Sequence, residues 1–225
     1  MIRYLGILLI PLSGLCAAPQ IAVIGNTEID FGTYPAKEIK QAQFVIKNSG
    51  DSVLKISGLR LTCDCSTVDI STKNLAPGTS SKLSLHVNGN SLDGEFNRKI
   101  YVLSDDPKNG CLELTFRGNA KPICEISQEK EVYLGTLSSN GTLQYSFKLK
   151  ATEGGVVPGT PIIKASFPVK ASINKRSERE FALEVFASDL KTTPARFTLE
   201  IAVPINQPSG WAPLKMTLAG RIKAN

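Results

Sequence analysis

The sequence predicts an all-β protein built from two tandem β-sandwich domains, and three observations support this prediction. Apolar and polar residues alternate over short runs, turn-forming dipeptides separate these runs, and landmarks of the first half recur in the second half. The 225 residues are 42% hydrophobic, which is enough for a packed core and excludes a disordered chain.

The first element is a targeting segment. Arg3 precedes an apolar run, Leu5–Leu15, that is too short to span a bilayer, and the small residues Cys16-Ala17-Ala18 follow it. This pattern predicts a signal peptide over residues 1–18, cleaved after Ala17 or Ala18. We therefore expect a periplasmic or extracellular protein whose mature chain has no transmembrane segment. Lipidation of Cys16 stays open, although Leu15 is larger than the small residue expected before a lipidated cysteine, and a buried first strand or helix is the alternative.

Short strands follow, each with one buried face. Alternation of apolar and polar residues predicts strands at Gln43–Lys47, Val53–Ile56, Lys82–Val87, Lys99–Val102, Leu112–Arg117 and Tyr145–Leu149. Dipeptides such as Pro77-Gly78, Asp93-Gly94, Asn109-Gly110, Asn140-Gly141 and Pro158-Gly159 suit the turns between strands. The step from Asn48 to Asp51 predicts a hairpin turn rather than a ligand contact.

The spacing of two landmarks indicates a duplication. Asp30-Phe31-Gly32-Thr33 is echoed by Tyr133-Leu134-Gly135-Thr136, and the glycines are 103 residues apart. Near the other end, Gly118 is echoed by Gly220, 102 residues later, each after an alternating strand. We therefore predict two domains, residues 21–120 and 123–225, each about the size of an immunoglobulin-like sandwich.

The first repeat resembles the ASH/Hydin-like immunoglobulin-like domains and a bacterial family of unknown function related to them. The resemblance is carried by ordered motifs that end at Gly118: Asp30-Phe31-Gly32, Phe44, Asn48, Gly50, Leu54-Lys55-Ile56, Cys63-Asp64-Cys65-Ser66, Leu75-Ala76-Pro77-Gly78, Gly94, Ser104-Asp105-Asp106-Pro107 and Leu114–Gly118. The second repeat departs from this pattern because it has no Cys-x-Cys, so we interpret it as a diverged copy. The resemblance implies a seven-stranded sandwich of the ASH/MSP type in an exported bacterial protein, and it implies no activity.

Four cysteines follow the signal peptide: Cys63, Cys65, Cys111 and Cys124. An even number in an exported chain predicts disulfides or buried thiols. If one strand runs through Cys63 and Cys65, their Cα atoms lie about 6.6 Å apart with parallel side chains, so we expect this pair least. The other pairings stay open: Cys63–Cys111 with Cys65–Cys124, or Cys63–Cys124 with Cys65–Cys111.

A rival interpretation makes the Cys63-x-Cys65 motif a functional centre. Thiolates of Cys63, Cys65 and Cys124 could bind copper or zinc, with Asp64 or His86 beside them, or the motif could form a redox pair. Cys-x-Cys spacing is weak support for zinc, and a thioredoxin-like site needs Cys-x-x-Cys on a βαβ unit. We therefore expect no metal and no cofactor, and keep this interpretation as the alternative.

The sequence does not predict an enzyme or catalytic residues. His86 is the only histidine, and its phase in Leu85-His86-Val87 places it on the outer face of a strand. The motifs of serine hydrolases, phosphate-binding loops and zinc proteases are missing from the sequence. The pair Asp105-Asp106 predicts a turn rather than a calcium site.

The net charge of +6 is concentrated in the second half. Five basic residues predict a patch near a hairpin tip that could meet an anionic surface: Lys164, Lys170, Lys175, Arg176 and Arg179. An ordinary solvated loop, interrupted by Glu178 and Glu180, is the favoured interpretation. Nucleic acid is not an expected partner, because aromatic residues do not interleave with the basic ones. We expect a non-enzymatic binding or scaffolding protein whose partner is a protein or another envelope component.

Overall fold

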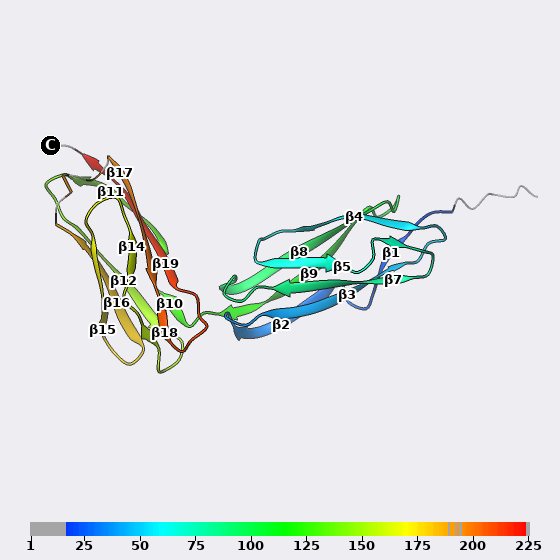
Figure 1. Ribbon diagram of the computed structural model, residues 1–225, viewed down its shortest axis with the longest axis horizontal. Helices are drawn as coiled ribbons and strands as arrows, with labels where there is room; N and C mark the ends of the chain where they lie inside the picture. The colour runs from blue at the N-terminus through cyan, green and yellow to red at the C-terminus, as the bar shows by residue number, and fades with distance from the viewer. Residues whose placement is uncertain (1–16, 189, 192, 194, 224–225) are drawn as a thin grey trace, which may run out of the picture. The chain divides into compact units, whose positions relative to one another are not determined.

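The computed structural model describes residues 17–188, 190, 191, 193 and 195–223. Residues 1–16 of the predicted signal peptide, with Cys16, lie outside this part of the chain. The described chain divides into two compact units, one of residues 17–29, 41–86 and 98–116 and one of residues 30–40, 87–97 and 117–223. The sheets give a simpler description, because each takes its strands either from residues 21–121 or from residues 124–223. We call these sets of strands the first and second repeats (Figure 1).

Two sheets make up the first repeat. One has the order β1-β3-β7-β5, with the bounds Ile21–Ile24, Lys40–Asn48, Ser80–Val87 and Ser66–Ile70. The other has the order β2-β9-β8-β4-β6, with the bounds Glu28–Pro35, Cys111–Lys121, Gly94–Ser104, Leu54–Leu61 and Asn74–Leu75. These are nine strands in the described residues, where the resemblance implied seven.

The second repeat uses the same plan. One sheet has the order β10-β12-β16-β15, with the bounds Cys124–Ile126, Leu143–Ala151, Glu180–Ala187 and Lys170–Lys175. The other has the order β11-β19-β17-β14, with the bounds Glu131–Ser138, Leu214–Lys223, Arg196–Val203 and Ile162–Lys164. A small pair, β13 (Val157–Pro158) and β18 (Ile205–Gln207), is added. The strand orders of the two repeats therefore match one for one, apart from the short strands β6, β13 and β18.

Alternating burial produces the cores. In β7 the apolar residues Leu83, Leu85 and Val87 are fully buried, whereas His86 between them is exposed, as its phase predicted. In β17 the same alternation buries Leu199, Ile201 and Val203. The elements of the described chain are all β-strands, and each repeat has two main sheets that each bury one face. The protein therefore consists of two tandem immunoglobulin-like β-sandwich domains.

The predicted hairpin at Asn48–Asp51 is wrong. The turn exists, but β3 and β4 on either side of it belong to different sheets, so the chain crosses from one layer to the other. The Asn48 side chain is fully buried at this crossing. Its Oδ1 accepts from the backbone N–H groups of Gln20 (3.3 Å) and Gly50 (3.0 Å), and its Nδ2 donates to the carbonyls of Ser52 (2.7 Å) and Leu75 (2.9 Å). Asn48 is therefore a structural anchor.

Candidate functional site

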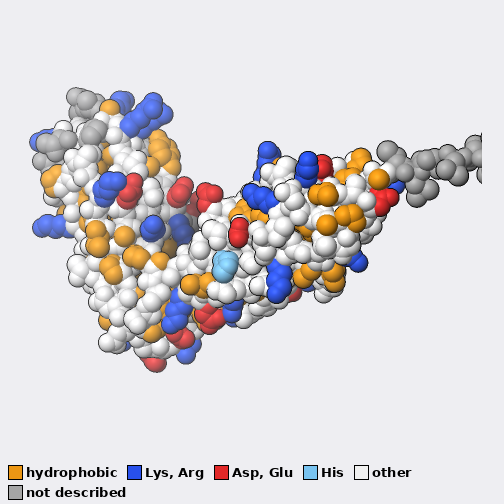
Figure 2. Space-filling view, turned by 45° about the vertical axis from the view of Figure 1, so that its right-hand side comes forward, with side chains coloured by type: hydrophobic (Ala, Val, Ile, Leu, Met, Phe, Trp, Pro, Cys, Tyr) orange, Lys and Arg blue, Asp and Glu red, His pale blue; other side chains and the backbone are white. Residues whose placement is uncertain are grey.

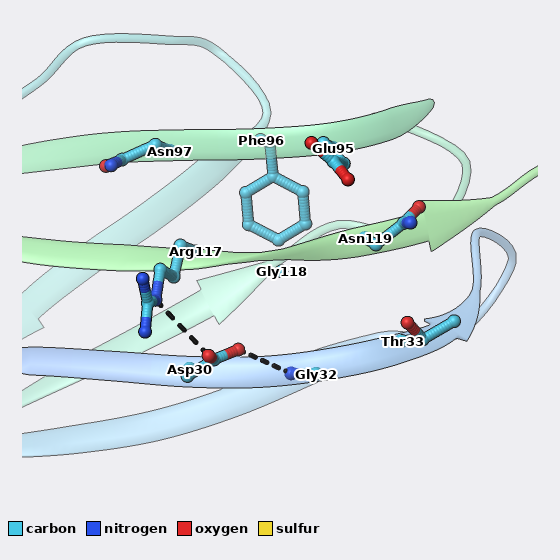
Figure 3. Close-up of a pocket in the computed structure, with 9 residues that line it drawn as sticks. All are labelled: Asp30, Gly32, Thr33, Glu95, Phe96, Asn97, Arg117, Gly118 and Asn119. Carbon is cyan, nitrogen blue, oxygen red and sulfur yellow. Dashed lines mark hydrogen bonds and ion pairs between the residues drawn. The ribbon is translucent and has the colours of Figure 1, made fainter.

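A shallow polar hollow of about 620 Å³ lies on strands β2, β8 and β9 of the first repeat (Figure 3). The residues that line it are Asp30, Gly32, Thr33, Glu95, Phe96, Asn97, Arg117, Gly118 and Asn119. The charged and amide side chains come from positions that alternate with buried ones, so they present donors and acceptors to solvent. Its size falls in the range of ligand sites, but its open shape suits an extended partner better than an enclosed small molecule.

Two glycines line the hollow. Gly32 has a φ of 62°, which a residue with a side chain rarely adopts. A Cβ added to Gly118 would lie 3.0 Å from the Gly32 carbonyl oxygen and 3.0 Å from Cζ of Phe96. The Phe96 ring, which is 6% exposed, therefore packs where a side chain at position 118 would lie. The ring also makes an edge contact with Tyr34, at 6.2 Å between centroids.

An ion pair connects two edges of the hollow. The Arg117 Nε lies 3.2 Å from a carboxylate oxygen of Asp30, and Asp30 Oδ1 accepts from the Gly32 N–H at 2.8 Å (Figure 3). Both side chains of the ion pair are about half exposed (51%), so the pair contributes little to stability but fixes where the guanidinium points. Glu95 adds a second carboxylate, so the three formal charges of the hollow sum to −1.

The second repeat has the same pair of glycines packed against a phenylalanine ring, which we call the floor of the hollow, but it lacks the Asp–Arg pair beside this floor. Gly135 has a φ of 76°, and a Cβ at Gly220 would lie 2.7 Å from Cζ of Phe197 and 3.2 Å from the Gly135 carbonyl oxygen. Around this floor, an exposed Tyr133 and Ala219 are register partners on neighbouring strands, and so are Arg196 and Arg221. By sequence offset, Tyr133 and Ala219 take the places of Asp30 and Arg117. The Asp–Arg pair of the hollow is therefore particular to the first repeat.

The sequence motifs do not predict the hollow. Asp30 and Arg117 belong to motifs of the first repeat, and those motifs do not include Glu95, Asn97 or Asn119. The alternation in two long strands does indicate a polar face there. Glu95 and Asn97 in β8, like Arg117 and Asn119 in β9, lie on either side of a residue that belongs to the buried face. Their proximity depends on the register between strands, which the sequence does not show.

The least expected cysteine pair is the one that the structure bonds. Cys63 and Cys65 form a disulfide, with their Cα atoms 5.3 Å apart. The expectation against this pair was wrong because it assumed a strand running through both residues. Instead, β4 ends at Leu61, and Thr62–Cys65 form a turn that leads to β5 in the other sheet. The turn brings the Cα atoms closer than an extended strand would.

The other two cysteines are free thiols, so neither alternative pairing is formed. Cys111 is exposed at the start of β9, and Cys124 is buried in β10. Burial, followed by the nearby charge of Glu125, raises the pKa of the Cys124 thiol to about 11. Cys124 is therefore protonated and unreactive near neutral pH. Within the described ranges, the structure gathers no group of three or more His, Cys, Asp and Glu residues that could hold a metal ion, which weakens the alternative at Cys63, Cys65 and Cys124.

The five basic residues do not share one tip. Arg176 and Arg179 flank the turn of the β15–β16 hairpin, but Lys164 is on β14 in the other sheet. Lys170 and Lys175 are at opposite ends of β15, about 17 Å apart at ~3.3 Å per residue. Lys164 is paired with Glu200 and Arg176 with Glu184, which reduces the free positive charge. On the face shown in Figure 2, Lys and Arg side chains are likewise scattered.

The two remaining expectations concern His86 and Asp106. His86 is an exposed residue of β7, and it lies at the surface in Figure 2. Asp106 is 5% exposed, and its Oδ1 accepts from the N–H groups of Lys108 (2.8 Å) and Asn109 (3.0 Å), which is the predicted turn. Its Oδ2 also accepts from the Ile21 N–H at 2.8 Å and so anchors β1.

Residues 22–120 match the profile of a family described as "Protein of unknown function (DUF1573)". The match covers the first repeat. Comparison with curated proteins gives no match. In the described chain, no helix is long and apolar enough to cross a membrane.

Several solved structures are similar to the chain at low identity. A protein of unknown function from Porphyromonas gingivalis W83 is 14% identical, with 91% of this chain and 99% of that chain covered and a TM-score of 0.34. The ASH / PapD-like domain 7 of human CEP192 is 14% identical over 54% of this chain and 99% of that chain, with a TM-score of 0.36. The titin Ig tandem domains A164-A165 are 11% identical over 93% and 98%, with a TM-score of 0.28. The fold assignment rests on the strand order of this chain.

Proposed function

We propose that this chain is an exported, non-enzymatic binding or scaffolding protein of the bacterial periplasm or cell surface, and that the hollow of the first repeat is its binding surface. The observation that carries the proposal is the set of donors and acceptors around Asp30 and Arg117. They lie on a rigid sheet above a floor of two glycines and Phe96. We also propose that the first repeat is a domain of the ASH/Hydin type.

The hollow suits a polar, extended partner. Arg117 offers a guanidinium held by Asp30, Glu95 offers an exposed carboxylate, and Asn97 and Asn119 offer amides that donate and accept. A surface of this kind gains specificity from the positions of its hydrogen bonds more than from apolar area. The partner is therefore a protein segment or another envelope component rich in hydrogen-bonding groups.

Export is proposed on the pattern of residues 1–18, and contacts at the start of the described chain distinguish the two cleavage sites. The Ala18 N–H donates to Asp51 Oδ1 at 2.7 Å, and the Asp51 N–H donates to the Ala18 carbonyl at 3.2 Å. Gly50 allows this approach, because a Cβ there would lie 2.2 Å from the Ala18 carbonyl oxygen. Cleavage after Ala17 places the new α-ammonium group beside the Asp51 carboxylate, whereas cleavage after Ala18 removes both contacts.

The binding proposal is tested with envelope extract from the native source. The mature protein, an Arg117→Ala/Asn119→Ala variant and a Thr198→Ala control in the second repeat are immobilised, and the retained components are quantified. We expect a component that the mature protein and the control retain and that the hollow variant retains at least about tenfold less. Equal retention by all three proteins contradicts the proposal.

The export proposal has its own test. Mass spectrometry of the native protein in the periplasmic and extracellular fractions should find an N-terminus at Ala18. An uncleaved chain confined to the cytoplasm contradicts export, and an acylated Cys16 contradicts cleavage at Ala17.

A further inference from the structure

The bonded cysteines lie where a disulfide adds little to the fold. Only Asp64 separates Cys63 from Cys65, so the bond closes a very small loop and removes little freedom from the unfolded chain. The second repeat makes the same crossing between sheets, from β14 to β15, without cysteines. There the buried Phe167 packs edge-on against Phe197, at 5.4 Å between centroids. The crossing therefore does not require a disulfide.

The two sulfurs differ in access. Cys63 is partly exposed, whereas Cys65 is 7% exposed. A thiol that approaches from solvent therefore meets Cys63, and Cys65 is the leaving group. Thiol–disulfide exchange depends on which sulfur can be attacked and on how well the leaving thiolate is stabilised.

A buried hydroxyl is in place to stabilise a thiolate. Ser66 is 4% exposed, and its Oγ lies 3.9 Å from Cys63 Sγ and 4.0 Å from Cys65 Sγ. A hydroxyl at this distance can donate to either sulfur, and it donates more strongly to a thiolate than to a disulfide sulfur. Ser66 therefore favours the reduced pair.

The turn is also anchored at its other end. The Thr62 N–H donates to the Lys99 carbonyl at 3.2 Å, and the Lys99 N–H donates to Thr62 Oγ1 at 3.1 Å. With Thr62 held by β8 and Ser66 held in β5, the two thiols stay close together after reduction. They can then be oxidised again without unfolding of the repeat.

We propose that Cys63–Cys65 is a reversible dithiol–disulfide site that takes two electrons from a partner dithiol, a role that goes beyond the proposed binding function. A thiolate of the partner attacks Sγ of Cys63, the Cys63–Cys65 bond breaks, and the electron pair leaves on Sγ of Cys65, which takes up the proton that the partner thiol lost. The second thiol of the partner, also deprotonated, attacks the partner sulfur of this mixed disulfide and releases Cys63, which takes the second proton. The products are a partner disulfide and two thiols in this chain, and a second partner disulfide reverses the exchange.

Asp64 adds a selectivity element. It is exposed between the two cysteines and carries a negative charge close to the attacked sulfur. This charge slows the approach of an anionic thiolate unless positive groups surround that thiolate. The geometry therefore favours a dithiol on a protein with a basic surface near its cysteines.

The first experiment titrates the folded mature protein in buffers of reduced and oxidised dithiothreitol and maps the thiols by alkylation and peptide mass spectrometry. We expect Cys63 and Cys65 to be reduced together while circular dichroism stays native, and to reoxidise when the ratio is reversed. A disulfide that survives in the native protein and is lost only in denaturant overturns the proposal.

The second experiment assigns the attacked sulfur in a Cys111→Ser background, which removes the exposed free thiol. Exposed to glutathione disulfide, the Cys65→Ala variant should form a mixed disulfide at Cys63 at least about tenfold faster than the Cys63→Ala variant forms one at Cys65. Equal rates overturn the assignment of Cys63 as the sulfur that exchanges with partners.

Matched variants test the two neighbours. Ser66→Ala should shift the equilibrium toward the disulfide by about fivefold, the equivalent of one hydrogen bond, whereas Ser81→Ala, which removes another buried hydroxyl, should not shift it. Asp64→Asn should speed reduction by anionic thiols, and added salt should narrow the difference. A shift that is equal in both serine variants contradicts the role of Ser66.

Discussion

The two repeats share one strand order but join their sheets differently. In the first, the step from β4 to β5 is a four-residue turn closed by Cys63–Cys65, and in the second the step from β14 to β15 carries the buried Phe167. The chain therefore makes the same crossing with a disulfide in one repeat and with a buried aromatic ring in the other. The comparison shows that packing of the sheets sets the architecture, and that the residues of the crossing can differ without a change in strand order.

The anchor of the first strand differs in the same way. Ser49 donates its N–H to the Gln20 carbonyl in the first repeat, and Thr152 donates its N–H to the Ile123 carbonyl in the second. The preceding residue, however, is the buried amide Asn48 in one repeat and the buried Ala151 in the other. The first repeat therefore depends on a polar network where the second has apolar packing.

The largest effect is expected at the aromatic crossing of the second repeat. Phe167→Ala removes a buried ring that packs against Phe197, and it should lower the free energy of unfolding by about 3–5 kcal/mol. Phe186→Ala is the control, because that ring is 42% exposed. Urea unfolding of the full chain checks both variants. A loss at Phe167 no larger than at Phe186 contradicts the interpretation of the ring as the anchor of this crossing.

The next effect is expected at the polar anchor of the first repeat. Asn48→Ala introduces the residue that the second repeat has, but it leaves one buried acceptor (Leu75), one part-buried acceptor (Ser52) and two part-buried donors without their partner, and it should cost about 2–4 kcal/mol. Asn74→Ala, on the exposed side of β6, should cost far less. If the two asparagine variants unfold at the same urea concentration, the hydrogen bonds of Asn48 do not anchor this crossing.

The glycines beside the two phenylalanines allow a finer comparison. An added Cβ lies 2.7 Å from the Phe197 ring at Gly220 but 3.0 Å from the Phe96 ring at Gly118. Gly220→Ala should therefore cost about 2 kcal/mol and Gly118→Ala about 1 kcal/mol, both through overpacking. Thermal unfolding of the two variants shows which one loses more stability, and a larger loss of stability in Gly118→Ala contradicts this prediction. Gly118→Ala should also shift the Phe96 ring and disturb binding at the hollow.

Much of the architecture could be predicted from the sequence, for a physical reason. Burial of one face of each strand imposes a period of two, and the paired glycines recur at nearly constant offset because both repeats pack a phenylalanine ring against them. The disulfide could not be predicted, because its pairing depends on whether β4 ends before or after Cys63. The hollow could not be predicted either, because it requires the register of β8 and β9 with β2, which is distant from them in the sequence.

The disulfide itself should have a modest effect on stability. The double variant Cys63→Ala/Cys65→Ala should cost at most about 1.6 kcal/mol from loop closure, because the relation that gives about 3 kcal/mol for a loop of about 15 residues gives little for so short a loop. Urea unfolding of the oxidised protein and of the double variant measures this difference. A loss of 3 kcal/mol or more contradicts the view that the bond contributes little to the fold, and it restores a purely structural role for the pair.

The smallest expected effect on stability is confined to the surroundings of Asp106. This residue precedes Pro107, and the second repeat has Gln207 before Pro208 at the corresponding place, so it has no matching carboxylate. Burial by itself raises the pKa of Asp106, but the backbone N–H groups of Ile21, Lys108 and Asn109 outweigh it and hold the pKa below its ordinary value. A carboxyl with a lowered pKa in the folded state stabilises that state above its unfolded pKa, and this contribution is lost as the pH falls through the folded pKa.

We therefore expect β1 to loosen selectively in acid. Because Asp106 accepts from the Ile21 N–H, hydrogen exchange in β1, corrected for the intrinsic effect of pH, should accelerate below about pH 4, whereas exchange in β10 should change less. Asp106→Asn should make exchange in β1 faster already at neutral pH and should remove most of its acid dependence. If β1 and β10 respond equally to acid in the unmodified chain, the carboxylate does not account for the difference between the two first strands.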